Sequence, residues 1–364
     1  MELAERTKRI DSSGIRKVFA LAANMTDPVN LSIGQPHFDV PESIKEVAIQ
    51  AIRDGRNSYT LTAGIPELRE RLLERYRQRR IEAEDVIITS GASGGILLCF
   101  LALLNEGDEI IIPDPYFVMY KHLANFIGAK PVYVDTYPDF QLDPVKIEAA
   151  ITPRTKMILL NSPNNPTGVV YTEAVLRGVM EVAAKHGLTI LTDEIYDCFL
   201  YDSKPISIAE WYPNTIVLSG FSKSAAMTGW RVGYALAPKA VVAAMANIQM
   251  YSFVCAPSFA QWAALAVLDE DTSANEDDYR RKRDLIYGGI KDRYEVTKPG
   301  GAFYIFPKAP SDDGDSFVQE AIGNNLLVVP GSVFSERKTH FRISFAAEDR
   351  EIGRGIEILN RLAG

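Results

Sequence analysis

Seven short apolar runs alternate with helical patterns between residues 85 and 237, and this alternation constrains the fold more than any other feature. The runs are continuously apolar, which is typical of strands buried on both faces of a largely parallel sheet. We therefore predict an α/β fold: a large doubly wound domain with a mostly parallel seven-stranded sheet. The predicted strands are residues 86–89, 109–112, 131–134, 157–160, 189–192, 216–218 and 232–235.

Helical patterns fill the segments between and around these runs. The clearest covers residues 173–186 and ends at Gly187, a residue suited to a helix C-cap. Further helices are predicted over residues 42–54, 66–80, 94–104, 239–254 and 257–268.

An acidic run at residues 269–278 is the best candidate for a domain boundary or for a solvated joint in a long helical connection. Beyond it, apolar runs and helical patterns predict a smaller α+β domain. We place the large domain at residues 32–275 and build the small domain from residues 1–31 and 276–364. Its predicted strands are residues 294–297, 302–306, 326–329 and 341–345.

Composition and charge exclude several classes of protein. The 364 residues carry a formal charge of −8, which argues against a nucleic-acid surface. The longest apolar stretch, residues 94–104, is too short to span a bilayer, and the charged first residues do not form a secretory signal. The three cysteines are widely spaced and the four histidines form no cluster, so we expect neither disulfides nor a metal site. These features predict a cytoplasmic protein.

Unusual side chains follow five of the predicted strands. Ligands of open α/β sheets bind beyond the carboxyl ends of the strands, so these side chains are expected to share one site. Each of these features also has an ordinary structural explanation, which is a helix cap, a core aromatic, a turn, a buried ion pair or a surface lysine. In chain order they are a Gly-rich turn before a helix at residues 89–95, the aromatic Phe117, the amide of Asn165, the carboxylate and phenol of Asp193 and Tyr196, and the amine of Lys223.

Lys223 is the most informative of these residues. It lies among small residues directly after a predicted strand, and Arg231 follows it closely. Burial and a nearby positive charge lower the pKa of an amine, and an unprotonated amine is the nucleophile for Schiff-base chemistry on a carbonyl. Taken together, a phosphate site, an aromatic face, an amide, a carboxylate and an amine suit a flat, phosphorylated, pyridine-type aldehyde.

At these positions the chain resembles the fold-type I pyridoxal-phosphate enzymes. More narrowly, it is similar to the class I/II aminotransferases of the aspartate and aromatic aminotransferase group. The resemblance extends from residue 13 to Arg342 and depends on the combination of residues 161–168, 193–196 and 222–233.

The resemblance implies roles around the cofactor, pyridoxal 5′-phosphate. Lys223 would bond to the cofactor and later move the substrate's proton, and Asp193 would keep the pyridine nitrogen protonated. Tyr196 and Asn165 would hydrogen-bond the phenolic oxygen of the ring, on which Phe117 would stack.

The same resemblance implies a phosphate site. Its ligands would be the backbone at Gly91, Ala92 and Ser93, together with Arg231, and Ser222 is a further candidate.

Three more residues are implied by the resemblance. Arg342 would bind the α-carboxylate of the substrate through the planar fork of its guanidinium group. Gly34 matches the loop that closes over the substrate. Tyr59 matches a tyrosine that reaches the phosphate in the partner subunit, so the resemblance implies a homodimer with shared sites.

Two departures from the family pattern bear on cofactor and substrate. Gly220 stands where many members carry a serine or threonine that binds the phosphate. Ser93 stands where some aspartate-specific members carry a lysine for the distal carboxylate. Together with the apolar character of Ile15, Val18 and Phe19, Ser93 favours a neutral or aromatic donor, and aspartate stays possible.

The implied reaction is a ping-pong transamination between an amino acid and a 2-oxo acid, with 2-oxoglutarate as the expected acceptor. A C–S lyase or a cyclising synthase of the same fold is the alternative. A transcription regulator with an aminotransferase-like domain would need a DNA-binding module, for which we expect no room before residue 13. A plain nucleotide-binding protein would leave Lys223, Asp193 and Tyr196 without a shared role.

Overall fold

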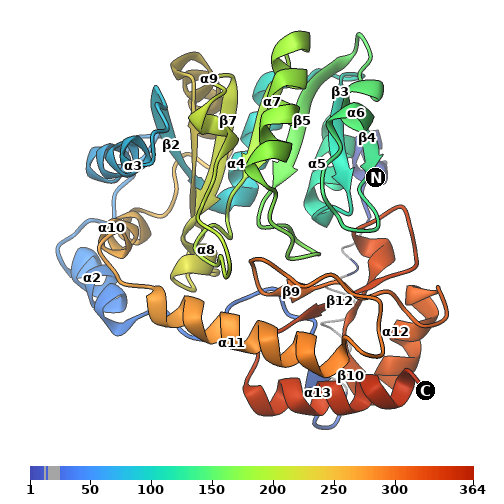
Figure 1. Cartoon of the computed structure of the whole chain (residues 1–364). Helices are drawn as coiled ribbons and strands as arrows, with labels where there is room; N and C mark the ends of the chain where they lie inside the picture. Colours follow the sequence, from blue (N-terminus) through green and yellow to red (C-terminus); the bar gives the residue numbers. More distant parts are fainter. Residues whose placement is uncertain (12–13, 15–24) are drawn as a thin grey trace.

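The computed structural model describes residues 1–11, 14 and 25–364. A seven-stranded sheet forms the centre of its larger part (Figure 1). The strands are β2 (Asp85–Ser90), β3 (Glu109–Asp114), β4 (Lys130–Asp135), β5 (Thr155–Asn161), β6 (Thr189–Asp193), β7 (Thr215–Gly220) and β8 (Val232–Ala237). Their order is β2-β8-β7-β6-β5-β3-β4, and β8 runs in the opposite direction to the other six strands. The predicted mostly parallel seven-stranded sheet is therefore confirmed.

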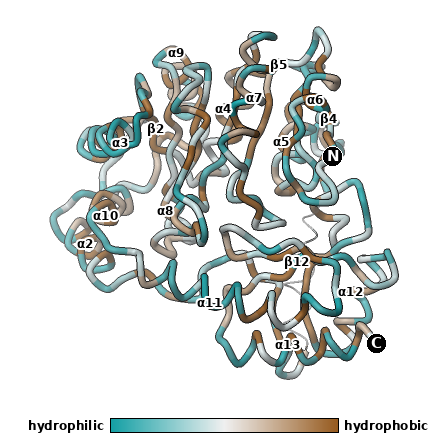
Figure 2. Tube along the Cα trace, viewed as in Figure 1, coloured by the Kyte–Doolittle hydropathy of each residue, from teal (hydrophilic) through white to brown (hydrophobic). Residues whose placement is uncertain are grey.

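The sheet is covered on both faces because successive side chains of a strand point in opposite directions. Ile87 and Ile110 pack in one hydrophobic cluster, whereas their neighbours Ile88 and Ile111 pack in clusters on the other face. Figure 2 shows hydrophobic residues concentrated along these strands. The first face carries α4 (Gly91–Leu103), α5 (Val118–Ile127) and α9 (Lys239–Met250). The second face carries α6 (Pro144–Ala149), α7 (Glu173–His186), α2 (Glu42–Arg53), α3 (Pro66–Gln78) and α10 (Ser258–Val267).

The C-terminal part of the chain packs around a smaller core. A two-stranded sheet joins β1 (Val29–Asn30) to β10 (Leu326–Leu327), so a segment near the N-terminus pairs with the C-terminal region. A three-stranded antiparallel sheet has the order β11-β12-β9. Its strands are β9 (Tyr304–Ile305), β11 (Val329–Pro330) and β12 (Phe341–Ser344), and the helices are α11 (Ser273–Ile290), α12 (Gly314–Gly323) and α13 (Asp349–Leu362). Helix α11 begins inside the acidic run, and the division at residues 31/32 and 275/276 stays a prediction.

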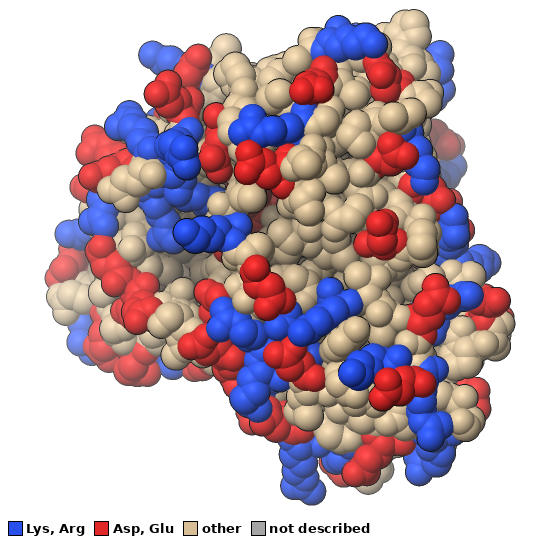
Figure 3. All heavy atoms as spheres, in the orientation of Figure 1, with Lys and Arg blue, Asp and Glu red and all other residues tan. Residues whose placement is uncertain are grey.

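Short elements complete the fold. The described 3-10 helices are η1 (Glu5–Arg9), η2 (Ile208–Glu210) and η3 (Gly331–Val333), and the four-residue helix α8 (Phe221–Ser224) follows β7. Acidic and basic side chains are interspersed over most of the face shown in Figure 3.

Several predicted elements differ from the structure. The strand expected over residues 326–329 is divided between β10 and β11, which belong to different sheets, and only two residues of the strand expected over 302–306 form β9. The helix expected over residues 239–254 ends at Met250, because Val254 adopts a left-handed backbone conformation (φ 65°) and its N–H bonds to the carbonyl of Gln249. The strand expected over residues 294–297 does not form. There Tyr294 is buried and its hydroxyl donates to the carbonyl of Leu359, so core packing without a neighbouring strand explains the apolar pattern.

Candidate active site

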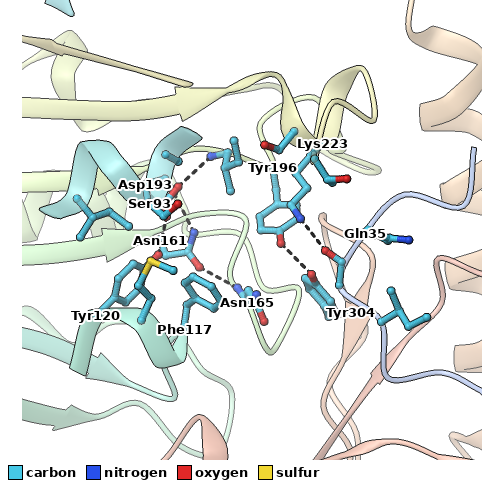
Figure 4. Close-up of a pocket in the computed structure, with 18 of the residues that line it drawn as sticks. Gln35, Ser93, Phe117, Tyr120, Asn161, Asn165, Asp193, Tyr196, Lys223 and Tyr304 are labelled. Carbon is cyan, nitrogen blue, oxygen red and sulfur yellow. Dashed lines mark hydrogen bonds between the residues drawn. The ribbon is translucent and has the colours of Figure 1, made fainter. Parts of the chain in front are cut away.

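A cavity opens at the carboxyl ends of the parallel strands, between the seven-stranded sheet and the C-terminal part of the chain (Figure 4). It brings together most of the side chains predicted for the site. The predicted residues that line it are Gly34, Ala92, Ser93, Phe117, Asn165, Asp193, Tyr196, Ser222, Lys223, Arg231 and Arg342. Gly91 lies directly behind the lining, against Arg231, whereas Tyr59 does not line the cavity.

Lys223 enters the cavity from α8, immediately after β7. Its Nζ donates a hydrogen bond of 2.6 Å to the carbonyl oxygen of Gly34. Burial lowers the pKa of the amine to about 8, and the positive charges of Arg342 and Arg231 act in the same direction. About one tenth of this amine is therefore unprotonated at pH 7, far more than for a lysine with its ordinary pKa, and the unprotonated form is the one that a nucleophile or a general base requires.

Asp193 lies at the end of β6 and is buried. Tyr120 donates a hydrogen bond of 2.7 Å to Oδ2, and the backbone N–H of Ile195 donates one of 3.2 Å to Oδ1. Burial raises the pKa of the carboxyl to about 6, against the hydrogen bond from Tyr120 and the charge of Lys223. The group is thus an anion at pH 7, held in place by donors and available to a cationic partner.

Arg342 projects from β12 and is only 1% exposed. Its Nη1 donates to Oδ1 of Asn165 at 3.0 Å, and its Nη2 donates to the carbonyl of Ser32 at 2.9 Å. No carboxylate lies within ion-pair distance of this guanidinium group among the described residues. A buried, hydrogen-bonded cation that lines a cavity is suited to bind an anionic ligand.

The opposite end of the cavity offers donors for a phosphate. Helix α4 begins here without a side-chain cap, so its first backbone N–H groups are available to an anion. Arg231 lies beside them and donates a hydrogen bond of 2.8 Å to Oγ of Ser93. Gly91 (φ 68°) permits this approach, because a Cβ there would lie 2.4 Å from Nη2 of Arg231. The amine, the carboxylate and this anion site therefore fit pyridoxal phosphate.

The structure explains Gly220. A Cβ at this position would lie 2.8 Å from the Cα of Gly233 and 3.1 Å from the carbonyl of Val232. A serine or threonine would push β7 away from β8, so the phosphate ligand carried there by many family members does not fit this chain.

Several lining residues were not predicted from the sequence, among them Tyr120, Asn161 and Tyr304 (Figure 4). Asn161 donates to the carbonyl of Asp193 and accepts from the backbone N–H of Asn165. It stands in the Asn-rich segment that the sequence singled out, and Tyr120 follows Phe117 by one helical turn. These spacings were usable signals, whereas Tyr304 lies in an apolar run that indicated only a strand.

Tyr59 lies on the surface and is 83% exposed in the single chain. Other large apolar side chains are exposed at Leu61, two residues along the chain, and at Tyr251 and Phe253. Gln249 ties the two segments together by donating to the carbonyl of Thr62. We call residues 59–61 and 250–254 the apolar surface.

Some predictions fall outside what the structure describes. The positions of Ile15, Val18 and Phe19 belong to the undescribed residues. Over residues 1–11, 14 and 25–364, no group of three metal-binding side chains comes together. In the same part of the chain, every helix is too short or too polar to cross a bilayer.

Comparisons with known proteins agree with this geometry. Residues 26–359 match the family model of the class I and II aminotransferases. The chain is 38% identical to a probable aspartate aminotransferase of Methanocaldococcus jannaschii, over 99% of each chain. It is 36% identical to an aromatic-amino-acid aminotransferase of Thermococcus litoralis, over 100% of this chain and 98% of the relative. The solved aspartate aminotransferase of Thermus thermophilus with maleate superposes with a TM-score of 0.96, at 35% identity and full coverage of both chains.

Proposed function

This chain belongs to the class I and II aminotransferases, and we propose that it moves the α-amino group of a neutral or aromatic amino acid to 2-oxoglutarate. It is a transaminase that depends on pyridoxal phosphate, as its family does. The named relatives are aminotransferases, which favours transamination over the elimination or cyclisation that the sequence left open. The single observation that carries the proposal is the cavity that collects Lys223, Asp193 and Arg342.

We assign the chemistry to the chain's own side chains. When bound, pyridoxal phosphate supplies an aldehyde that bonds to amines and a ring that accepts the electron pair of a broken C–H bond. The neutral Nζ of Lys223 would take the proton from the α-carbon of the donor in the first half-reaction, and in the second half-reaction the same nitrogen would deliver a proton to the α-carbon of the new amino acid. The anionic Asp193 stabilises a proton on the ring nitrogen, and Arg231 with the first turn of α4 binds the phosphate.

Arg342 is proposed to bind the α-carboxylate of both substrates. Asn165 and the carbonyl of Ser32 each occupy one terminal nitrogen of the guanidinium group, which holds its plane in one orientation. A carboxylate can then be bound through two parallel N–H groups, and this fixes the α-carbon relative to Lys223.

The charges of the cavity support a neutral donor side chain. Lys223, Arg231 and Arg342 are the cations of the lining that the structure describes, and each already has a role above. The remaining wall includes Ile33, Ile96 and Met119. An apolar or aromatic side chain gains from contact with this wall, whereas a second carboxylate loses hydration without a counter-ion.

The same cavity has to accept the distal carboxylate of 2-oxoglutarate in the second half-reaction. Gln35 lines the cavity and is exposed at its mouth. Its uncharged side-chain amide can donate a hydrogen bond to that carboxylate. When an apolar side chain of the amino acid occupies the cavity instead, Gln35 leaves no unpaired charge there.

A panel of donors tests this proposal. Purified enzyme is mixed in single turnovers with phenylalanine, tyrosine, leucine, methionine or aspartate, and the conversion of the cofactor from its aldehyde to its amine form is followed by absorbance. We expect phenylalanine to exceed aspartate in kcat/KM by about 10-fold or more, because an unpaired carboxylate is costly to bury. A preference for aspartate would overturn the donor assignment but not transamination. Release of ammonia without the amine form would instead support a lyase.

We further propose a homodimer in which Tyr59 reaches the partner's phosphate site. The apolar surface that contains Tyr59 lies next to the first turn of α4, because a Cβ at Gly94 would lie 3.9 Å from the ring of Phe253. Apolar surfaces of this kind mark protein interfaces, and a two-fold axis would place each Tyr59 against the other copy.

Mixing two impaired variants tests the shared site. Lys223→Ala lacks the amine and Tyr59→Ala lacks the phenol, so each homodimer is weak at limiting cofactor. After co-refolding in equal amounts, random pairing restores about one quarter of all sites to full composition. Activity well above the sum of the separate variants is the expected result. If the activity of the mixture equals the sum of the activities of the separate variants, Tyr59 contributes to the site of its own chain or to no site.

A further inference from the structure

We propose that Tyr304 is a positioning residue for transamination: its hydroxyl group orients the hydroxyl of Tyr196, and its ring orients the guanidinium of Arg342. The proposal rests on the proposed function of the cavity. Tyr304 lies on β9, is 1% exposed and lines the cavity (Figure 4). It therefore connects the C-terminal sheet to the side chains that follow β6.

The first contact is between two phenols. The hydroxyl oxygens of Tyr304 and Tyr196 lie 2.8 Å apart, and the rings meet edge to face at a centroid distance of 5.6 Å. Each hydroxyl carries one hydrogen, so one of the two donates and the other accepts.

The charge beside Tyr304 favours it as the donor of this pair. The guanidinium carbon of Arg342 lies 4.5 Å from the centroid of the Tyr304 ring. Burial raises the pKa of Tyr304, and this cation and the hydrogen bond with Tyr196 both oppose that rise. The cation also opposes the rise in the pKa of Tyr196, but there burial and Tyr304 are the larger causes and both raise the pKa. When Tyr304 donates, the hydrogen of Tyr196 is left to point into the cavity, toward the ring oxygen of the bound cofactor.

The second contact is the stacking on Arg342. Its guanidinium carbon lies 4.5 Å from the ring centroid of Tyr304 and 4.6 Å from that of Phe334. The rings therefore restrict the group that binds the substrate carboxylate, in addition to its hydrogen bonds.

The loop that carries Gly34 depends on the same residue. A Cβ at Gly34 would lie 2.9 Å from the hydroxyl oxygen of Tyr304 and 3.9 Å from Nη2 of Arg342. The absence of a side chain at Gly34 lets the loop pass over Tyr304, where its carbonyl accepts from Lys223. Tyr304 is thus adjacent to the residues proposed for cofactor tuning, carboxylate binding and proton transfer.

Two substitutions in the holoenzyme separate the hydroxyl from the ring. Tyr304→Phe removes the hydroxyl and keeps the ring over Arg342. Tyr304→Met removes both while it retains most of the buried volume. Two properties are measured: the pH midpoint of the absorbance change of the bound cofactor, and the KM for the amino donor.

For Tyr304→Phe we expect the absorbance midpoint to rise by about half a pH unit, because Tyr196 becomes a poorer donor to the ring oxygen. The donor KM should change by less than about 2-fold, since the stacking persists. For Tyr304→Met we expect the same rise in midpoint and a KM about 10-fold higher, because the guanidinium is less restricted.

Tyr201→Phe is the matched control. Tyr201 belongs to the same hydrophobic cluster, and its buried hydroxyl donates to the carbonyl of Ala302, but it does not line the cavity. This variant should lose thermal stability while the midpoint and the KM stay at wild-type values.

An unchanged midpoint in Tyr304→Phe would overturn the role of the hydroxyl, and an unchanged KM in Tyr304→Met would overturn the role of the ring. If Tyr304→Met does not fold, Phe334→Leu removes the other stacked ring and tests the restriction of Arg342. The midpoint requires only bound cofactor. A wild-type protein that titrates but does not transaminate would therefore refute the proposed function separately.

Discussion

Replacing Lys223 with alanine is expected to leave a folded protein that has lost nearly all transamination. The side chain has two roles in the proposed reaction, because it bonds to the cofactor and moves the proton at the α-carbon of the substrate. A positioned general base alone contributes about 10²- to 10⁴-fold, and we expect a loss in kcat at or beyond the upper end of that range. Single-turnover absorbance measurements with saturating cofactor separate the proton-transfer defect from weak cofactor binding.

The fold should survive because the buried amine lowers the free energy of unfolding of the cofactor-free protein. Burial lowers the pKa of Lys223 from 10.5 to about 8, so the folded state binds its proton less well than the unfolded chain. The protonated amine therefore destabilises the folded state at every pH below 8, and this destabilisation disappears as pH rises from 8 through 10.5. That gap corresponds to about 3 kcal/mol.

Urea unfolding of the cofactor-free proteins measures this effect. We expect Lys223→Met to be more stable than wild type at pH 7 and to lose its advantage as pH approaches 10.5. Lys121→Ala is the control for both experiments, because Lys121 pairs with Glu336 and does not line the cavity. Near-normal turnover in Lys223→Ala would remove this lysine from the mechanism.

The large sheet was predictable because its signal is local. The inner parallel strands are apolar on both faces, and the sequence therefore shows each of them as a short continuous run without any knowledge of its neighbours. The smaller sheets gave a weaker signal. The runs at residues 302–306 and 341–345 contain the shorter strands β9 and β12, whereas residues 294–297 have a similar pattern without a strand. An apolar run reports burial, and only the tertiary structure decides whether a partner strand lies beside it.

The site was predictable to the same extent. Lys223, Asp193 and Asn165 each follow a predicted strand, so the rule that ligands bind at strand ends gathered them before the structure was known. Tyr304 follows no such rule. Its contacts with Tyr196 and Arg342 join segments far apart in the chain, and the hydroxyl pair spans 108 residues.

Replacing Asp193 with asparagine should produce the second largest loss. The carboxylate is anionic at pH 7 and stabilises a proton on the ring nitrogen in the proposed reaction. Asparagine keeps the shape and the acceptor for Tyr120, but it supplies no charge. Electrostatic groups of this kind contribute about 10²- to 10³-fold, and we expect kcat to fall by that factor while the protein still binds some cofactor.

The pH dependence of cofactor binding identifies the cause of this loss. Burial raises the pKa of Asp193 to about 6, so the wild-type site loses its anion as pH falls through 6 and should bind the ring-protonated cofactor less tightly. The phosphate group also titrates near this pH, but it does so in both proteins, so the ratio of the two dissociation constants isolates the carboxylate. That ratio should be large at pH 8 and about 10-fold smaller at pH 5, where about one tenth of the carboxyl is still ionised. Asp135→Asn is the control, because Asp135 ends the edge strand β4, pairs with Arg337 and does not line the cavity. A ratio that stays constant from pH 5 to pH 8 would show that the charge of Asp193 has no part in holding the cofactor, and an unchanged kcat would show that it has no part in the reaction.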